Sequence, residues 1–412
     1  MSKLVFPPAP LSPPGPGFGR ETVHGAASSP SPLSPAPAAG HSNLWIFVPV
    51  LFLTCMGITM VFSASSALAL KNYGSEFYFM KRQAQWAGIG LLAMLACRLV
   101  PLEWVRKSAY PLLLITAMLL LAVKFSALGK EVGGARRWLA FGDLTFQPAE
   151  LARPALIIYL AYSLDRKIAR IREFSIAMLP HLIVLGCFAG LILGQPDFGS
   201  AIILCLIGMT MIFTAGVPSW HLLPPVFLVL PAGWWLVVSS GYRMRRIISF
   251  INPWAYSDTE GYQVVHSLMA FGTGGLWGVG FGNGFQKLFY LPEPHTDFIF
   301  SVIGEETGFA GVTVLLLLYG LILWRGIRIA LGARTGFQSL LAVGLVVSLG
   351  YQVVINMGVT MSILPTKGLT LPFISYGGSS LMISLACIGL LMNIGAAPAA
   401  GPKFHGTEGR RS

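Results

Sequence analysis

The sequence has few charged residues: 11% of its 412 residues are Asp, Glu, Lys or Arg, whereas 54% are hydrophobic. A soluble domain carries about 25% charged residues, so this composition excludes an ordinary soluble enzyme and predicts an integral membrane protein. Cysteine is scarce as well. The five cysteines fall inside apolar stretches and form no CxxC pair or Cys/His cluster, which argues against a disulfide framework and a structural metal site.

Long apolar runs recur along most of the chain. A membrane-spanning helix needs about 20 apolar residues, and ten stretches approach that length, although another count stays open. They predict an all-α polytopic membrane protein, a bundle of ten transmembrane helices. The predicted spans are 45–69, 83–100, 109–128, 148–164, 176–194, 199–216, 221–239, 298–324, 337–359 and 373–396. The fourth is the weakest, because it is short and opens with Glu150 and Arg153.

The segments around these runs define the expected domains. Residues 1–43 are rich in Pro, Ser, Ala and Gly and lack the apolar core of a signal peptide, which predicts a disordered tail. A membrane domain is expected over 44–397, with one large extracytoplasmic loop, 240–297, between the seventh and eighth spans. Residues 398–412 form a short second tail.

The net charge is +12, and the placement of the basic residues indicates topology. With an even number of spans, most Lys and Arg residues fall in the tails and in the loops on the same side. The positive-inside rule therefore predicts that both termini are cytoplasmic. We attribute the basic excess to this topology and to anionic lipid rather than to nucleic acid.

One stretch, LPEPHTDFIFSVIGEETG at 291–308, concentrates polar side chains at the mouth of the eighth span. These are Glu293, His295, Asp297, Glu305 and Glu306. Acidic residues at a membrane helix are costly unless they line a cavity, so they indicate a functional site. The alternative for Asp297 is a helix cap. Glu305 and Glu306 lie about 100° apart on a helix, so one of them is expected to pair elsewhere.

Two earlier segments hold further candidates. In the loop after the third span, Arg136 and Arg137 face outward, and Glu150 and Arg153 have the spacing of a helical ion pair. That pair is either structural or in contact with substrate. Asp197 follows Pro196 in a tight turn, where an N-cap is the favoured role and a cavity-lining role is second.

Two later segments interrupt the apolar pattern. The glycine-rich run at 272–284 matches no nucleotide-binding loop, so its glycines indicate close packing or a re-entrant bend. The aromatic residues that follow could stack on sugars or form an interfacial belt. At 364–381, prolines and Gly368 break the helix beside Lys367, which either snorkels to lipid headgroups or binds substrate. Ser375 opens a small, polar stretch there.

Five motifs in order identify a resemblance. They are RWLAFGDLTFQPAELAR, QPDFGSA, YRMRRIISFINPW, LPEPHTDFIFSVIGEETG and LPTKGLTLPFISYGGSSL. Over about 45–396 the chain resembles the SEDS family (shape, elongation, division and sporulation), and it is more similar to the division branch. The resemblance implies a ten-helix bundle with cytoplasmic termini, polymerisation of lipid II into peptidoglycan outside the inner membrane, and Asp297 as the essential carboxylate. It also implies that the protein acts together with a class B penicillin-binding protein and other division proteins at the septum.

The residues fit that chemistry. Joining an α-linked diphosphate donor into a β-1,4 linkage is one inverting displacement, which needs a base for the acceptor hydroxyl and cations near the leaving phosphates. Arg243, Arg246 and Lys367, or a divalent cation (Mg²⁺ or Mn²⁺), could supply that charge, and no organic cofactor is expected. The candidate substrate-binding residues are Arg136, Arg137, Glu150, Arg153, Asp197, Arg243, Arg246, His295, Lys367 and Ser375.

Two other classes of function stay open. A lipid II flippase would use the carboxylates to move a proton or to gate a polar cavity, and a division scaffold would use none of them. Within the family, a role in elongation or sporulation is the alternative to division. A flippase predicts charged residues deep in the bundle, whereas the acidic candidates gather at one end.

Overall fold

The computed structural model describes residues 39–126, 129–132, 135–142, 144–239, 241–288, 291–366 and 368–396. The chain separates into two units, 1–38 and 39–412, and all described residues belong to the second. The predicted C-terminal tail and Lys367 therefore lie outside the described residues, as do residues 1–38 of the predicted N-terminal tail. The remainder of that tail, from Ala39, is already part of the first helix.

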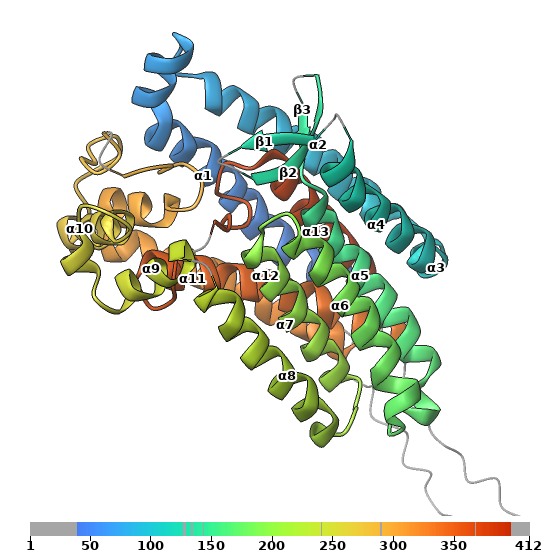
Figure 1. The fold of residues 1–412 in the computed structure, drawn as a ribbon. Coiled ribbons are helices and arrows are strands. Elements are labelled where there is room, and N and C mark those ends of the chain that lie inside the picture. Colours follow the sequence, from blue (N-terminus) through green and yellow to red (C-terminus); the bar gives the residue numbers. More distant parts are fainter. Residues whose placement is uncertain are drawn as a thin grey trace, which may run out of the picture. The chain divides into compact units, whose positions relative to one another are not determined.

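Helices make up most of the described chain (Figure 1). They are α1 (Ala39–Tyr73), α2 (Tyr78–Leu99), α3 (Leu102–Lys107), α4 (Ala109–Phe125), α5 (Pro148–Arg166), α6 (Leu179–Leu193), α7 (Phe198–Thr214), α8 (Ser219–Val238), α9 (Gly241–Ile251), α10 (Tyr262–Gly274), α11 (Ile299–Leu331), α12 (Gly336–Thr360) and α13 (Gly378–Ala396). Short helical turns cover Ile168–Arg170, Phe174–Met178 and Pro253–Tyr256.

A helix lies over each predicted span. Among the described residues, five helical stretches are long and apolar enough to cross a membrane: 43–73, 174–193, α11, α12 and α13. Helices α4 and α7 are apolar but shorter. The chain is thus a helical protein with several membrane-spanning helices, and the count of ten remains a prediction.

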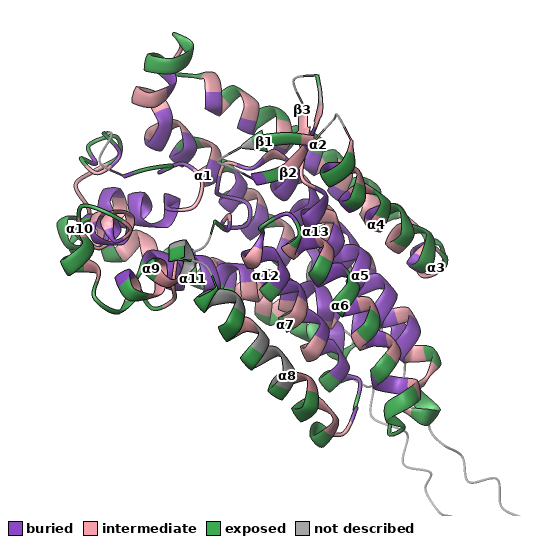
Figure 2. Cartoon of the chain, viewed as in Figure 1, coloured by how far each residue is buried: buried purple, intermediate pink, exposed green. Residues whose placement is uncertain are grey.

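Helix α5, the weakest of the predicted spans, lies inside the bundle. It packs against α4, α7 and α12 and is buried along most of its length (Figure 2). The opposite holds for α4, which exposes large apolar side chains such as Leu114 and Ile115. Apolar exposure of this kind suits a lipid-facing helix, whereas the polar residues of α5 are shielded by protein.

A small antiparallel sheet corrects the all-α prediction. Its strands are β1 (Gly129–Val132), β2 (Ala135–Phe141) and β3 (Leu144–Phe146), with β2 in the centre. Along β2, Ala135 and Leu139 are buried whereas Arg136 is exposed, which is the alternation expected of a strand with one covered face. The sheet contacts α4, α5 and α13, and that covered face explains why a short loop sequence forms strands.

Helix α11 is broken at Gly308, whose φ of 65° and ψ of −166° are not helical. The glycine-rich segment supplies the backbone partners that the break removes. The four bonds run from Val279 N to Glu305 O (3.0 Å), from Gly280 N to Glu306 O (3.1 Å), from Phe309 N to Gly275 O (2.9 Å) and from Ala310 N to Leu276 O (3.1 Å). A Cβ on Gly278 would lie 2.2 Å from the Glu306 carbonyl oxygen. Close packing, one of the two interpretations of this run, is therefore confirmed.

Candidate functional site

Asp297 lies just before α11, and its side chain is partly exposed. The N-cap position of α11 belongs to Phe298, which makes no side-chain cap bond, so the structure does not favour a capping role for Asp297. Asn356 of α12 donates to the Asp297 carbonyl (3.1 Å) and to the Leu369 carbonyl (2.6 Å). One amide thus holds together the segment that carries Asp297 and the segment that precedes α13.

The surroundings of Asp297 raise its pKa to about 7. Desolvation by the surrounding protein is the main cause, and repulsion from Glu293 adds to it. The guanidinium groups of Arg246 and Arg137 act in the opposite direction, and the carboxylate of Asp197 raises the pKa slightly. Charged groups from β2, α9 and the start of α7 therefore all influence the pKa of one carboxylate.

Arg137 of β2 contacts the turn between α6 and α7, to which Asp197 belongs. Arg137 donates to the carbonyls of Gln195 (3.2 Å) and Pro196 (2.6 Å). Asp197 is the N-cap of α7, as expected: its carboxylate accepts from the Ser200 amide (3.1 Å) and hydroxyl (2.8 Å). Asp197 also acts on the pKa of Asp297, and its cavity-lining role stays a prediction.

His295 and Ser375 shape the backbone beside Asp297. The His295 ring is buried against Phe79 and Tyr376, at centroid distances of 4.6 and 5.5 Å, and burial lowers its pKa to about 4. Ser375 donates to the Thr296 carbonyl (2.6 Å) and accepts from the Leu371 amide (2.8 Å). The bonds of Ser375 connect two loops, so its visible role is to support the site.

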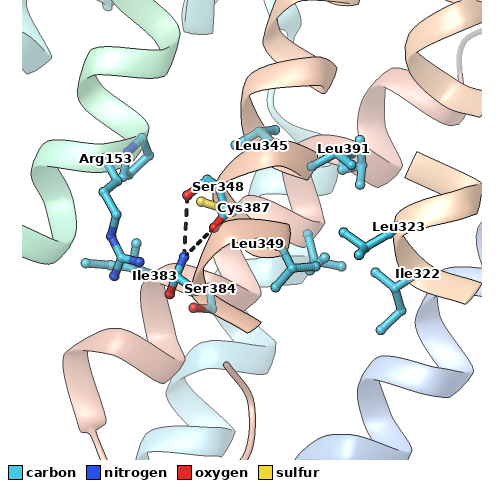
Figure 3. Close-up of a pocket in the computed structure, with 14 residues that line it drawn as sticks. Arg153, Ile322, Leu323, Leu345, Ser348, Leu349, Ile383, Ser384, Cys387 and Leu391 are labelled. Carbon is cyan, nitrogen blue, oxygen red and sulfur yellow. Dashed lines mark hydrogen bonds between the residues drawn. The ribbon is translucent and has the colours of Figure 1, made fainter. Parts of the chain in front are cut away.

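Glu150 and Arg153 form the expected ion pair, and both side chains are buried. Arg153 also lines a cavity of about 30 Å³ inside the bundle, with Ser348, Gln352 and Cys387 (Figure 3). That volume suits a water molecule, not a sugar. Arg153 is the one charged residue among the described residues that line it. The cavity therefore provides no chain of carboxylates through the bundle.

The remaining candidates are Arg136, Arg246, Arg243 and Lys367. Arg136 pairs with Glu131 (3.7 Å) on the face of β2 opposite to Arg137, where it lines a surface pocket. Arg246 donates to the Thr366 carbonyl (3.4 Å), next to Lys367 in the sequence. Arg243 lies on α9, but its side chain, like Lys367, is outside the described residues.

Lys287, which is not among the residues predicted from the sequence, forms a buried ion pair with Glu306 (2.6 Å). Glu305 instead accepts from the backbone amides of Phe285 (2.8 Å) and Gln286 (3.3 Å). The two neighbouring glutamates thus have different partners, as their angular separation on a helix indicates. Lys287 is the only Lys or Arg between Arg246 and Arg325 in the sequence, and this isolation was the signal available.

The described residues contain no group of three or more His, Cys, Asp or Glu side chains placed to hold a metal ion. Mg²⁺ is commonly held by one or two carboxylates together with substrate phosphates. A divalent ion at this site would therefore depend on Asp297 and on the diphosphate of a bound donor.

Comparison with known proteins finds relatives that match nearly the whole predicted membrane domain. The model of the cell cycle protein family of FtsW, RodA and SpoVE matches residues 43–398. The probable peptidoglycan glycosyltransferase FtsW of Geobacter metallireducens is 44% identical over 352 residues, which cover 85% of this chain and 94% of the relative. Stage V sporulation protein E of Bacillus subtilis is 41% identical over 353 residues, covering 85% and 96%.

Two solved structures are similar over nearly the same part of the chain. The rod shape determining protein RodA of Thermus thermophilus matches with a TM-score of 0.63 and 30% identity, covering 85% of this chain and 96% of that one. A chain of a peptidoglycan synthase complex, described as coordinating polymerization and crosslinking, matches with a TM-score of 0.70 and 32% identity, covering 84% and 96%.

Proposed function

The chain belongs to the FtsW, RodA and SpoVE family of cell cycle proteins, and we propose that it polymerises lipid II with Asp297 as general base. It is a peptidoglycan glycosyltransferase of cell division. The observation that carries the assignment of the base is the partly exposed carboxylate of Asp297 just before α11, on a backbone held by Asn356; the charges of Arg137, Arg246 and Asp197 also act on its pKa.

In the proposed reaction, Asp297 takes the proton of the acceptor sugar's 4-hydroxyl as its oxygen attacks the anomeric carbon of the donor. The bond to the diphosphate breaks at the same time, which inverts the α linkage to β-1,4 and releases undecaprenyl diphosphate. A general base works best when its pKa lies near the working pH, and the pKa of Asp297 is raised to about 7. A carboxylate at its ordinary pKa would be a much weaker base.

The leaving diphosphate needs positive charge. Arg246 and Arg137 already act on Asp297 electrostatically, so a diphosphate beside Asp297 would lie near both. Arg243 lies three residues before Arg246, and Lys367 follows Thr366, whose carbonyl accepts from Arg246; both complete the proposed cationic set. A bound divalent ion would supply the same neutralisation.

The proposed orientation puts both termini in the cytoplasm and Asp297 at the extracytoplasmic surface of the inner membrane. The division septum is the proposed location. Lipid II remains in the bilayer through its tail, so a site at the membrane surface can receive its sugars while the tail stays in lipid. A class B penicillin-binding protein is the proposed partner, and the similarity to a chain of a peptidoglycan synthase complex supports it.

Asp297→Asn tests the proposal, because it keeps the size of the side chain and removes the base. General-base catalysis contributes about 10²–10⁴-fold, so purified variant protein with lipid II and the partner synthase should make no detectable glycan strands. Gel analysis of the strands gives the readout, and membrane insertion and partner binding serve as controls. Strands made at a near wild-type rate would refute the base and favour a flippase or a scaffold.

A further inference from the structure

The segment that carries Asp297 has contacts between the residues at its two ends. Residues 287–306, here called the 287–306 loop, begin before α11 and run through Asp297 into the first turns of that helix. Just before the loop, the amides of Phe285 and Gln286 donate to Glu305. A Cβ on Gly284 would lie 2.8 Å from the Glu305 carboxylate. The two ends of the loop are therefore in direct contact.

A buried ion pair completes this closure. Lys287 Nζ lies 2.6 Å from Glu306 Oε1, and the two side chains are 6% and 0% exposed. Ser63 of α1 donates to the same oxygen (2.6 Å) and accepts from Lys287 (2.8 Å). The other oxygen, Glu306 Oε2, is buried and has no hydrogen-bond partner among the described residues. Lys287 is thus the group that compensates this buried charge.

The middle of the loop is fixed separately. Three successive carbonyls accept hydrogen bonds from outside the loop. They belong to His295 (from Tyr376 N, 2.9 Å), Thr296 (from Ser375 Oγ, 2.6 Å) and Asp297 (from Asn356 Nδ2, 3.1 Å). The backbone at Asp297 is therefore held by α12 and the segment before α13, whereas residues 285–287 are held by Glu305 and Glu306 of α11.

A buried ion pair is often no more stabilising than an apolar pair of the same size, so stability alone does not account for it. We propose that Lys287 and Glu306 are positioning residues, which close the 287–306 loop so that the Asp297 carboxylate stays in place for the acceptor hydroxyl. This inference rests on the proposed function of Asp297. Both side chains are buried, so their proposed role is to act through Asp297 rather than on substrate.

The test replaces both charges together, with Lys287→Met and Glu306→Gln in one chain. The double variant leaves no unpaired buried charge, so it should insert and purify like the wild type. Small displacements of a catalytic group cost up to about a hundredfold, and we expect the maximal rate of glycan synthesis to fall about tenfold or more. The lipid II concentration that gives half the maximal rate should change little.

The pH profile separates positioning from mere folding. Asp297 is faced by Glu293 on the loop, Arg246 on α9, Arg137 on β2 and Asp197 at α7. A loosened loop admits water to Asp297 and lowers its pKa, so the acid limb of the rate should move to lower pH. Loss of folded protein alone would reduce the amplitude without moving the limb. The reversed pair, Lys287→Glu with Glu306→Lys, should restore both the rate and the limb.

A matched control is the exposed ion pair between Arg245 and Glu260 (2.6 Å). Arg245→Met with Glu260→Gln should keep the wild-type profile. An unchanged rate and limb in the Lys287/Glu306 double variant would overturn the inference while leaving the base in place. If Asp297→Asn stays active, the proposed function fails and the inference fails with it. If the double variant does not fold, the reversed pair Lys287→Glu, Glu306→Lys provides the test. A reversed pair that folds but has its acid limb at a lower pH than the wild type also overturns the inference.

Discussion

Gly368 lies directly against Asp297: a Cβ added at residue 368 would be 3.1 Å from Asp297 Oδ2. Glycine at this position leaves room for the carboxylate between the segment before α13 and the start of α11. That contact is tighter than most contacts between a Cβ and an oxygen, so a methyl group would displace the carboxylate.

Gly368→Ala should therefore lower the rate of glycan synthesis about tenfold, because the base no longer meets the acceptor hydroxyl at the right distance. The amount of inserted protein should stay near wild type, since Gly368 is exposed. Gly272→Ala is the matched control, because a Cβ there meets nothing within 4 Å. Equal rates for both variants would show that the carboxylate tolerates the crowding.

The rate should depend on pH through Asp297. The raised pKa of this acid, about 7, means that the active, ionised base is lost as the pH falls through that value. The rate should drop about tenfold per pH unit well below the midpoint. His295 stays neutral in this range because burial lowers its pKa to about 4. A flat profile between pH 5 and 8, measured with saturating lipid II, would contradict a base with the raised pKa.

Lys367→Ala separates two roles for that residue. If Lys367 neutralises the leaving diphosphate, the variant should lose most of its polymerisation activity while it still inserts. If the side chain only reaches toward lipid headgroups, the variant should be nearly silent. Initial rates with purified lipid II distinguish the two, and a wild-type rate removes Lys367 from the site.

The ion pair between Glu150 and Arg153 should matter most when only half of it is removed. Arg153→Met leaves a buried carboxylate without its cation, which costs about 3–5 kcal/mol. The double variant Glu150→Gln, Arg153→Met should recover most of that loss. Thermal unfolding in detergent, followed by size-exclusion chromatography, measures both. Equal destabilisation by the single and double variants would mean that the pairing itself contributes nothing.

The orientation can be mapped with a reporter that is active only outside the cytoplasm. Fusions within 129–147 or 255–290 should be active, and fusions at 165–172 or after Ala400 should not. The expectation follows from the bias of Lys and Arg toward one side of the membrane. An active fusion after Ala400 would exclude an even number of spans with a cytoplasmic N-terminus.

Features that depend on a single segment of the chain could be predicted from the sequence. Apolar length predicted the helices, and the cap of Asp197 could be read from its turn. The sheet was missed because its covered face is formed by α4, α5 and α13, which no local pattern reveals. Lys287 was missed for a similar reason, since its role depends on Glu306 and on Ser63 of α1. The sequence also left the roles of Glu150 and Arg153 open, because spacing predicts a pair but not its burial.

The break in α11 has a consequence for how the protein is made. The amides of Phe309 and Ala310 find their partners in residues 275 and 276, which are synthesised earlier and belong to another segment. In the bilayer, an unpaired amide costs several kcal/mol. During biogenesis the second half of α11 therefore reaches its stable state only after the glycine-rich segment has docked. Replacing a glycine at the contact, as in Gly278→Val, is therefore expected to lower the amount of correctly inserted protein more than the rate per inserted molecule.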